Sequence, residues 1–157
     1  MRNFNLLITV IFSCSIAWAQ QDLGIVGPNN WLRGWTSFKP LTNDYPQTTR
    51  ILPNVISADF KLSSYETYSL VGEVYVTNNA TLTIEPGTII RASSDEYSAL
   101  IITKGSKIIA EGLTNNPIIF TSSRSAKERK PGDWGGIYIL GNAPINLYGG
   151  VYRIESS

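Results

Sequence analysis

The sequence has no histidine, and its single cysteine, Cys14, lies close to the N-terminus. The lack of histidine excludes Ser-His-Asp triads, Cys-His dyads, histidine-ligated zinc sites and the usual general base near neutral pH. One cysteine forms no intrachain disulfide and no thiolate metal cluster. Carboxylate, lysine, arginine and tyrosine side chains are what remains for chemistry.

Residues 1–19 have the three parts of a secretory signal peptide. Arg2 supplies the positive charge, residues 6–16 (LLITVIFSCSI) form an uncharged apolar run too short to span a bilayer, and residues 17–19 (AWA) fit the small-x-small cleavage rule. The mature chain is then expected to begin at Gln20, and the protein to be exported to the periplasm, the outer-membrane surface or the extracellular space. In a competing interpretation Cys14 is lipidated, although the bulky Phe12 fits a lipoprotein motif poorly.

Net charge is also lacking. Removal of Arg2 with the signal leaves 12 basic and 12 acidic residues, so the mature 138 residues carry no formal net charge. Such a balance gives no field that gathers nucleic acid or an anionic membrane surface. We therefore expect no nucleic-acid partner, and no transmembrane segment after signal cleavage. The length suits one domain with a core of its own.

What the sequence does contain is an internal repeat. Residues 74–87 (VYVTNNATLTIEPG) align with residues 100–113 (LIITKGSKIIAEGL) at a constant offset of 26. Apolar and polar residues alternate over short stretches, which are separated by Asn78-Asn79 in one copy and Lys104-Gly105 in the other. This pattern is typical of short strands and tight turns. The matching positions are Val74 with Leu100, Val76 with Ile102, Thr77 with Thr103, Ala80 with Ser106, Leu82 with Ile108, Ile84 with Ala110, and Glu85 with Glu111.

A third short strand follows in each copy, at residues 88–90 and 118–120, and a weaker third copy covers residues 135–140, 143–147 and 151–154. Three short strands per repeat describe one triangular coil of an all-β, right-handed, single-stranded parallel β-helix. One coil buries about six aliphatic side chains, worth roughly 9 to 18 kcal/mol, whereas ordering about 25 residues costs about 1.5 kcal/mol for each. The coils must therefore stack.

We expect about three coils over residues 71–157, cut short, and an irregular N-terminal cap segment over residues 20–70. The cap segment has scattered aromatics and prolines without a clear period. Large aromatic side chains over the open end would protect the unpaired edge of the first coil. We interpret Trp31 and Trp35 as residues of β-strands in preference to a binding platform, and expect further short strands at residues 50–55 and 65–71.

Five runs are specific enough to indicate a family: residues 51–59, 63–67, 72–93, 99–123 and 128–146. They resemble a group of Bacteroidetes cell-surface proteins of the parallel β-helix type, many of which carry a type IX secretion sorting domain. The resemblance implies this fold and export, and no particular reaction. The sequence departs from the group after Asn146, where related proteins continue through further coils, and no sorting domain is present. We expect either a fragment of a longer protein or a C-terminal edge that a partner covers.

The longest non-repetitive connection, residues 121–136 (TSSRSAKERKPGDWGG), is the candidate binding region, because long loops in compact domains are usually functional or disordered. In a sugar-binding interpretation a pyranose ring stacks on Trp134, while Asp133 and Arg129 hydrogen-bond its hydroxyls or carboxylate. In the alternative, which we favour, Trp134 anchors the loop onto the coil and Gly135-Gly136 allow close backbone approach.

The carboxylates give weaker signals. Glu85 and Glu111 occupy equivalent places in successive coils, about 4.8 Å apart, and glycoside hydrolysis needs two carboxylates facing one cleft. Each precedes a turn, so we interpret both as solvated acids and expect no catalytic residue. Asp95-Glu96 supply too few oxygens for calcium. The glycosylation motif at Asn79 is read as part of an Asn-rich turn. No metal and no cofactor is expected.

The sequence thus favours an exported, non-catalytic β-helix module that serves as a scaffold, adhesion or glycan-contact element at the cell surface. Its partner would be a surface polysaccharide or another envelope protein. The alternative is a carbohydrate-active enzyme, either a polysaccharide lyase or a hydrolase, or the truncated remnant of one. A third possibility is a truncated product with no independent role.

Overall fold

The computed structural model describes residues 40–144, 146 and 149. Within this part of the chain, a single 3₁₀ turn, η1 (Pro40–Thr42), precedes eleven short strands. The strands are β1 (Arg50–Ile51), β2 (Val55–Ile56), β3 (Phe60–Leu62), β4 (Thr67–Leu70), β5 (Glu73–Val76), β6 (Thr81–Ile84), β7 (Ile89–Ala92), β8 (Ala99–Ile102), β9 (Lys107–Ala110), β10 (Ile119–Ser122) and β11 (Gly136–Ile139).

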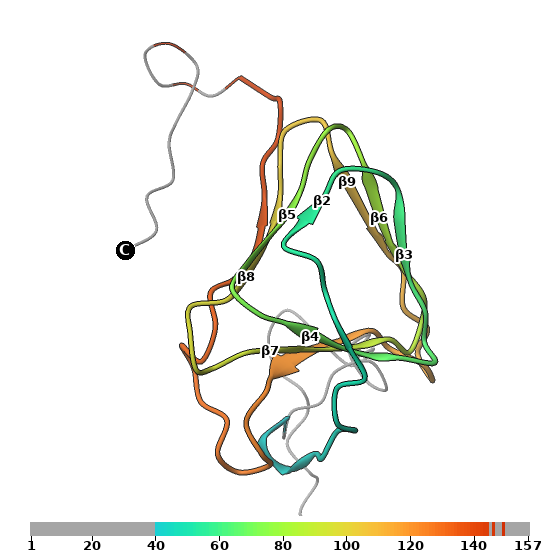
Figure 1. Ribbon diagram of the computed structural model, residues 1–157, viewed down its shortest axis with the longest axis vertical. Helices are drawn as coiled ribbons and strands as arrows, with labels where there is room; N and C mark the ends of the chain where they lie inside the picture. Colours follow the sequence, from blue (N-terminus) through green and yellow to red (C-terminus); the bar gives the residue numbers. More distant parts are fainter. Residues whose placement is uncertain (1–39, 145, 147–148, 150–157) are drawn as a thin grey trace, which may run out of the picture. The chain divides into compact units, whose positions relative to one another are not determined.

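Every third strand joins the same sheet. The three sheets have the orders β1-β4-β7-β10, β2-β5-β8-β11 and β3-β6-β9, and all their strand pairs are parallel. Seen along the stack, the sheets form the three sides of a triangle (Figure 1). The chain is therefore a parallel β-helix, as the repeat predicts, with three coils of three strands followed by β10 and β11.

The strand register confirms the 26-residue repeat. Val74 pairs with Leu100 in one sheet, and Leu82 pairs with Ile108 in the next. In the third sheet the offset is 30, because Ile89 pairs with Ile119. The four additional residues lie in the turn between β9 and β10, which an antiparallel bridge between Leu113 and Asn116 closes. This insertion is why the repeat alone leaves the position of the third strand uncertain.

Asparagine and glycine stack at the turns between coils. Asn79 has a left-handed backbone (φ 57°). Its side-chain oxygen lies so close to Gly105 of the next coil that a Cβ on Gly105 would be only 2.2 Å from it. Asn116 lies over Gly87 in the same way, and its amide donates to the carbonyl of Pro86 at 3.1 Å. Both glycines have φ of +86°, a conformation that disfavours residues with a side chain. The turn sequences thus keep the coils in register.

The core lies inside the triangle and consists of inward-facing aliphatic rows. Alternate residues of each strand point inward, because side chains of a strand alternate between its faces. The most deeply buried aliphatic side chains are Leu62, Leu70, Val74, Val76, Leu82, Ile84, Ile90, Leu100 and Ile102. The rows are continuous from coil to coil, so the inward side chains of each coil are covered by those of the coils above and below it.

The ladder reaches further toward the N-terminus than the expected cap over residues 20–70. Four strands, β1–β4, lie between Arg50 and Leu70 and pair with later coils. Strand β1 lies within the stretch expected at residues 50–55 and β4 within that expected at 65–71, whereas β2 begins at Val55 and β3 was not expected. All four belong to the solenoid, because Ile56, Leu62 and Leu70 extend its inward rows. Residues 20–39, with Trp31 and Trp35, and the expected signal peptide lie outside the described residues.

The third copy of the repeat is present in part. Strand β11 occupies the position expected at residues 135–140 and pairs with β8. The segment expected at residues 143–147 has no strand at its described positions, 143, 144 and 146. The strand expected at residues 151–154 lies outside the part that the structure describes.

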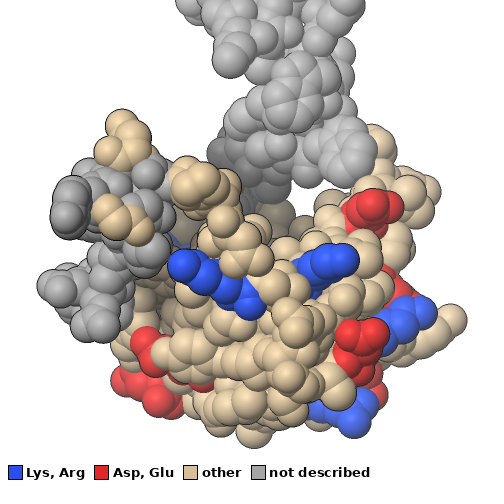
Figure 2. Space-filling model, turned by 90° about the horizontal axis from the view of Figure 1, so that it is seen from above, with Lys and Arg blue, Asp and Glu red and all other residues tan. Residues whose placement is uncertain are grey.

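Charged side chains of both signs are interspersed on the face shown in Figure 2. This distribution fits the near-neutral composition and offers no single-signed field over that face. Within residues 40–144, no helix has the length and apolar character needed to cross a bilayer.

Leu82→Ala is expected to lower the free energy of unfolding by about 2–5 kcal/mol, because the fully buried side chain lies between Phe60 and Ile108 and its loss leaves a cavity. The matched control is Thr83→Ala, the next residue of β6, which is only partly buried. Its expected effect is below about 1 kcal/mol. Guanidinium titration followed by circular dichroism measures both. Equal losses at the two positions would contradict the inward aliphatic row.

Candidate functional site

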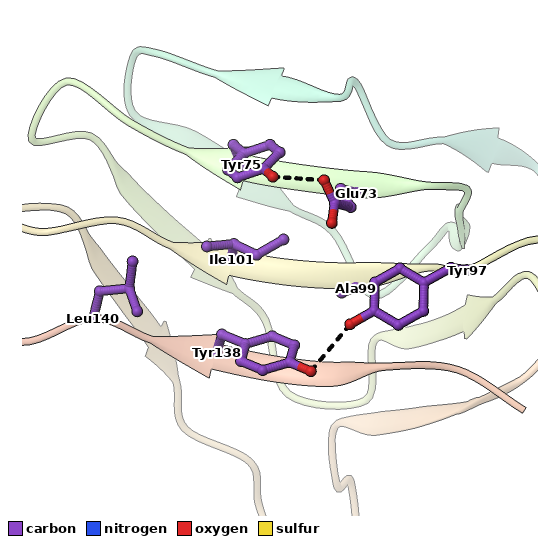
Figure 3. Close-up of a pocket in the computed structure, with 7 residues that line it drawn as sticks. All are labelled: Glu73, Tyr75, Tyr97, Ala99, Ile101, Tyr138 and Leu140. Atoms are coloured by element: carbon purple, nitrogen blue, oxygen red, sulfur yellow. Dashed lines mark hydrogen bonds between the residues drawn. The ribbon is translucent and has the colours of Figure 1, made fainter. Parts of the chain in front are cut away.

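The outer face of the β2-β5-β8-β11 sheet carries an open hollow of about 190 Å³. Figure 3 shows three tyrosines and one carboxylate around an aliphatic floor. The lining residues are Glu73, Tyr75, Tyr97, Ala99, Ile101, Tyr138 and Leu140. The hollow is smaller than the roughly 300–1,000 Å³ of pockets that enclose drug-sized ligands. It suits one ring or group of a larger ligand.

The register of the sheet creates the hollow by placing outward side chains in two adjacent columns. One column holds Tyr75, Ile101 and Tyr138, and the other holds Glu73, Ala99 and Gly136. Strands of a sheet are about 4.8 Å apart, so the two tyrosines of the first column are about 10 Å apart along the stack. Because Ala99 and Gly136 are small, the second column is low beside the tyrosines, and space remains above it.

Hydrogen bonds fix the hydroxyl groups of the three tyrosines around the hollow. The Tyr75 hydroxyl donates to Glu73 Oε2 at 2.6 Å, and the hydroxyls of Tyr97 and Tyr138 are 3.0 Å apart. The hydrogen bond to Glu73 is the main cause that raises the pKa of Tyr75, and the hydrogen bond to Tyr138 is the main cause that raises the pKa of Tyr97. Both phenols are therefore protonated at neutral pH.

Tyr97 is positioned by the corner that precedes β8. The neighbouring Ser98 is fully buried, accepts from the backbone N–H of Gly72 at 3.1 Å, and receives at its carbonyl the N–H of Gly135 at 2.7 Å. The Tyr97 ring lies directly against Gly135, where a Cβ would be 2.6 Å from the tyrosine oxygen. A glycine at this position is therefore what lets Tyr97 lie against the next coil and reach Tyr138.

A family model described as a pectate-lyase-like β-helix domain matches residues 54–156, well over half of the chain. The chain belongs to this family. The match begins in the first coil and includes every residue that lines the hollow. Neither the comparison with curated proteins nor the comparison with solved structures gives a match.

In this member of the pectate-lyase-like β-helix family, the loop between β10 and β11 carries the three residues expected to bind a sugar, and each contacts different partners. Trp134 stacks on Phe120, with ring centroids 6.5 Å apart and an interplanar angle of 13°. Arg129 is buried, donates to the carbonyls of Arg124 and Asn43 at 3.1 and 2.6 Å, and lies 4.7 Å from the ring centre of Tyr45. These contacts fasten the loop to the coil and to the segment before β1.

Asp133 supports the same loop from inside. Its side chain is 2% exposed, and its two oxygens accept from Arg124 Nε and from the backbone N–H of Lys130, each at 3.1 Å. Burial alone would raise the pKa of Asp133, but the hydrogen bonds from Lys130, Ser122 and Arg124 outweigh it and hold the pKa below its usual value. Sugar contacts by Trp134, Asp133 and Arg129 stay a prediction. The contacts that the structure shows for these three residues anchor the loop.

The two glutamates in equivalent coils have different surroundings. Glu85 pairs with Lys61 at 2.6 Å and accepts from the backbone N–H of Ser64 at 3.1 Å, whereas Glu111 is exposed. The hydrogen bond from Lys61, followed by that from Ser64, lowers the pKa of Glu85. A lowered pKa keeps a carboxylate ionised, which is unfavourable for a general acid. Both residues lie outside the lining of the hollow.

The remaining acidic and amide positions considered above are exposed turn residues. Asp95 and Glu96 are exposed in the turn before β8, and within the described residues no group of three or more acidic, histidine or cysteine side chains is placed to hold a metal ion. Asn79 is an exposed turn residue whose side chain stacks on Gly105.

Sequence reasoning missed the residues around the hollow, including Glu73, Tyr75, Tyr97 and Tyr138. A signal for two of them was present, because Tyr75 and Tyr138 occupy outward positions of strands, where polar residues are ordinarily expected. The sequence does not show that these two tyrosines lie close together, because the long loop before β11 breaks the 26-residue repeat. Gly136 of β11 pairs with Ala99 of β8, which is an offset of 37 residues.

Asp133→Ala is expected to raise the rate of tryptic cleavage after Lys127 and Arg129 about tenfold, because the loop loses two hydrogen bonds to a buried charge. Limited proteolysis with mass spectrometry measures the rate. Asp95→Ala is the matched control, because Asp95 is an exposed acid outside this loop. Unchanged cleavage of the Asp133 variant would show that other contacts suffice to hold the loop.

Glu85→Gln is expected to destabilise the protein at pH 7 and to lose this effect in acid. The folded-state pKa of Glu85 lies below its ordinary value of 4.5, so the carboxylate stabilises the fold above pH 4.5, and this contribution disappears as the pH falls through the lowered pKa. Thermal unfolding of both proteins across this range measures the difference, with Glu111→Gln as the control. A difference in melting temperature that is independent of pH would contradict the assignment.

Proposed function

We propose that this protein is an exported, non-catalytic β-helix scaffold that contacts glycans at the cell surface, and that the hollow lined by Tyr75, Tyr97 and Tyr138 is the contact site. The arrangement of three tyrosines on the outer face of one sheet is the observation that carries the proposal. Export rests on the signal-like residues 1–19. The partner is a surface polysaccharide.

The chemistry of tyrosine supports a sugar ligand. A tyrosine offers an apolar ring and a polar hydroxyl on one rigid side chain, and a sugar likewise has apolar C–H faces and hydroxyls. The hollow combines an aliphatic floor at Ala99, Ile101 and Leu140 with hydroxyl and carboxylate groups at its edge. Few convergent polar groups around an apolar surface are typical of small-molecule sites. The β-helix supplies rigidity, because each lining residue is on a strand or within two residues of one.

The distribution of carboxylates supports binding over glycoside hydrolysis. Hydrolysis of a glycosidic bond by the usual route requires two carboxylates that face the same cleft. Among the described residues that line the hollow, Glu73 is the single carboxylate, and its Oε2 is engaged by Tyr75. Glu85 and Glu111 lie at the corner between the other two sheets, after β6 and β9.

A carbohydrate-active enzyme is the second candidate, because the family description refers to a pectate lyase. In that case acidic polysaccharide would be cleaved, and carboxylate, lysine or arginine groups on the coils would do the chemistry. The two candidates differ in one measurable respect, which is product release.

For a polysaccharide that binds the protein, Tyr75→Ala and Tyr138→Ala are each expected to weaken binding about tenfold, because each removes a ring from the hollow. A panel of neutral and acidic polysaccharides is used, with affinity electrophoresis for binding and reducing-end or unsaturated-product assays for cleavage. The matched control is Tyr65→Ala, because Tyr65 is 95% exposed and lies outside the hollow.

Binding that is lost in the two hollow variants and kept in the Tyr65 variant, without product release, supports the scaffold. Product release that Glu111→Gln abolishes would overturn it in favour of the enzyme. Binding that all three tyrosine variants retain would place the contact elsewhere on the protein.

A further inference from the structure

The charge inside the hollow selects among saccharides. Of the described lining residues, Glu73 is the only charged one, and no lysine or arginine lines the hollow. A uronic acid would bring a second carboxylate next to Glu73 with no cation to compensate for it, and like charges at close range repel. The lining is thus unfavourable for acidic sugars.

Glu73 also has unused capacity to accept a hydrogen bond. Its Oε2 accepts from the Tyr75 hydroxyl at 2.6 Å, while no hydrogen bond to Oε1 is present among the described residues. Figure 3 shows the other carboxylate oxygen of Glu73 on the side of β8, the strand of Ala99. A hydrogen-bond donor of a ligand in the hollow can reach it there.

Tyrosine rings complete an environment for a cation. A positive group near the face of an aromatic ring is attracted by the ring quadrupole, and this attraction increases when the group is partly desolvated. Tyr75 lies beside Glu73, and Tyr97 and Tyr138 lie across the hollow, held by their mutual hydrogen bond. One carboxylate and three rings around a small apolar floor suit an ammonium group.

We propose that the hollow binds a saccharide through a protonated amino group, which donates to Glu73 and lies among the rings of Tyr75, Tyr97 and Tyr138. The ligand class is therefore amino sugars with a free amine, in preference to N-acetylated, neutral or acidic sugars. This inference rests on the proposed glycan-contact function and names the substrate class of the same site.

The test compares three oligosaccharides of matched length by isothermal titration calorimetry on the full chain: β-1,4-linked glucosamine, β-1,4-linked N-acetylglucosamine and α-1,4-linked galacturonate. The glucosamine oligomer is expected to bind about tenfold more tightly than its acetylated counterpart, because a charge-assisted hydrogen bond replaces a neutral contact. The galacturonate oligomer is expected to bind most weakly.

Glu73→Gln is expected to reduce this preference for the free amine to a ratio of about one, because it removes the charge and keeps the size of the side chain. Glu73→Asp keeps the charge and is expected to retain a preference. Glu111→Gln is the control for the loss of one negative charge, since Glu111 is exposed and outside the hollow, and it is expected to leave the preference unchanged. Far-UV circular dichroism verifies that each variant is folded.

Equal affinity for the amine and the N-acetyl oligomer would overturn the inference, and so would a preference that persists in Glu73→Gln. In either case, binding of a saccharide that Tyr75→Ala weakens would leave the glycan-contact function standing. If neither these oligosaccharides nor any polysaccharide of the neutral and acidic panel binds, the proposed function fails together with the inference.

Discussion

The parallel backbone ladder between successive coils is the interaction on which the rest of this structure depends. Each strand is only two to four residues long, and each forms its hydrogen bonds with the strand in the same position of the next coil. One coil alone cannot offset the entropy of ordering its residues. Stacking satisfies the backbone groups and joins the inward aliphatic side chains into continuous rows. The stability of the fold therefore depends on the stacking of the coils.

The same stacking also builds the candidate site. Residues that are 26 positions apart in the chain become neighbours on one outward face, as Tyr75 and Ile101 do. The hollow arises where small residues, Ala99 and Gly136, lie in one column and large ones lie in the next. The rigid ladder thus fixes the distance between the strand residues Tyr75 and Tyr138, which is favourable for binding a rigid ligand such as a sugar.

The long loop between β10 and β11 has a different role. Two of its charged residues are buried: Asp133 accepts from Arg124 and from the Lys130 backbone, and Arg129 reaches the segment before β1. Buried charges need such partners, because an unpaired charge in the interior is costly. The loop also delivers Gly135 to the corner below Tyr97. The same loop therefore anchors the segment between β10 and β11 and sets the position of Tyr97 in the hollow.

The sequence by itself determined the architecture, because a β-helix repeats locally. Alternation of apolar residues, the 26-residue offset and the Asn and Gly turns predicted the parallel coils and the pairs Val74–Leu100 and Leu82–Ile108, which the register confirms. Only the tertiary structure decided that β1–β4 belong to the solenoid and which residues lie around the hollow. The two- and three-residue strands β1–β3 are too short for a periodic signal, and Glu73, Tyr97 and Tyr138 come together across insertions of variable length. Proximity between such positions depends on how the chain stacks, because their spacing in the sequence follows no fixed period.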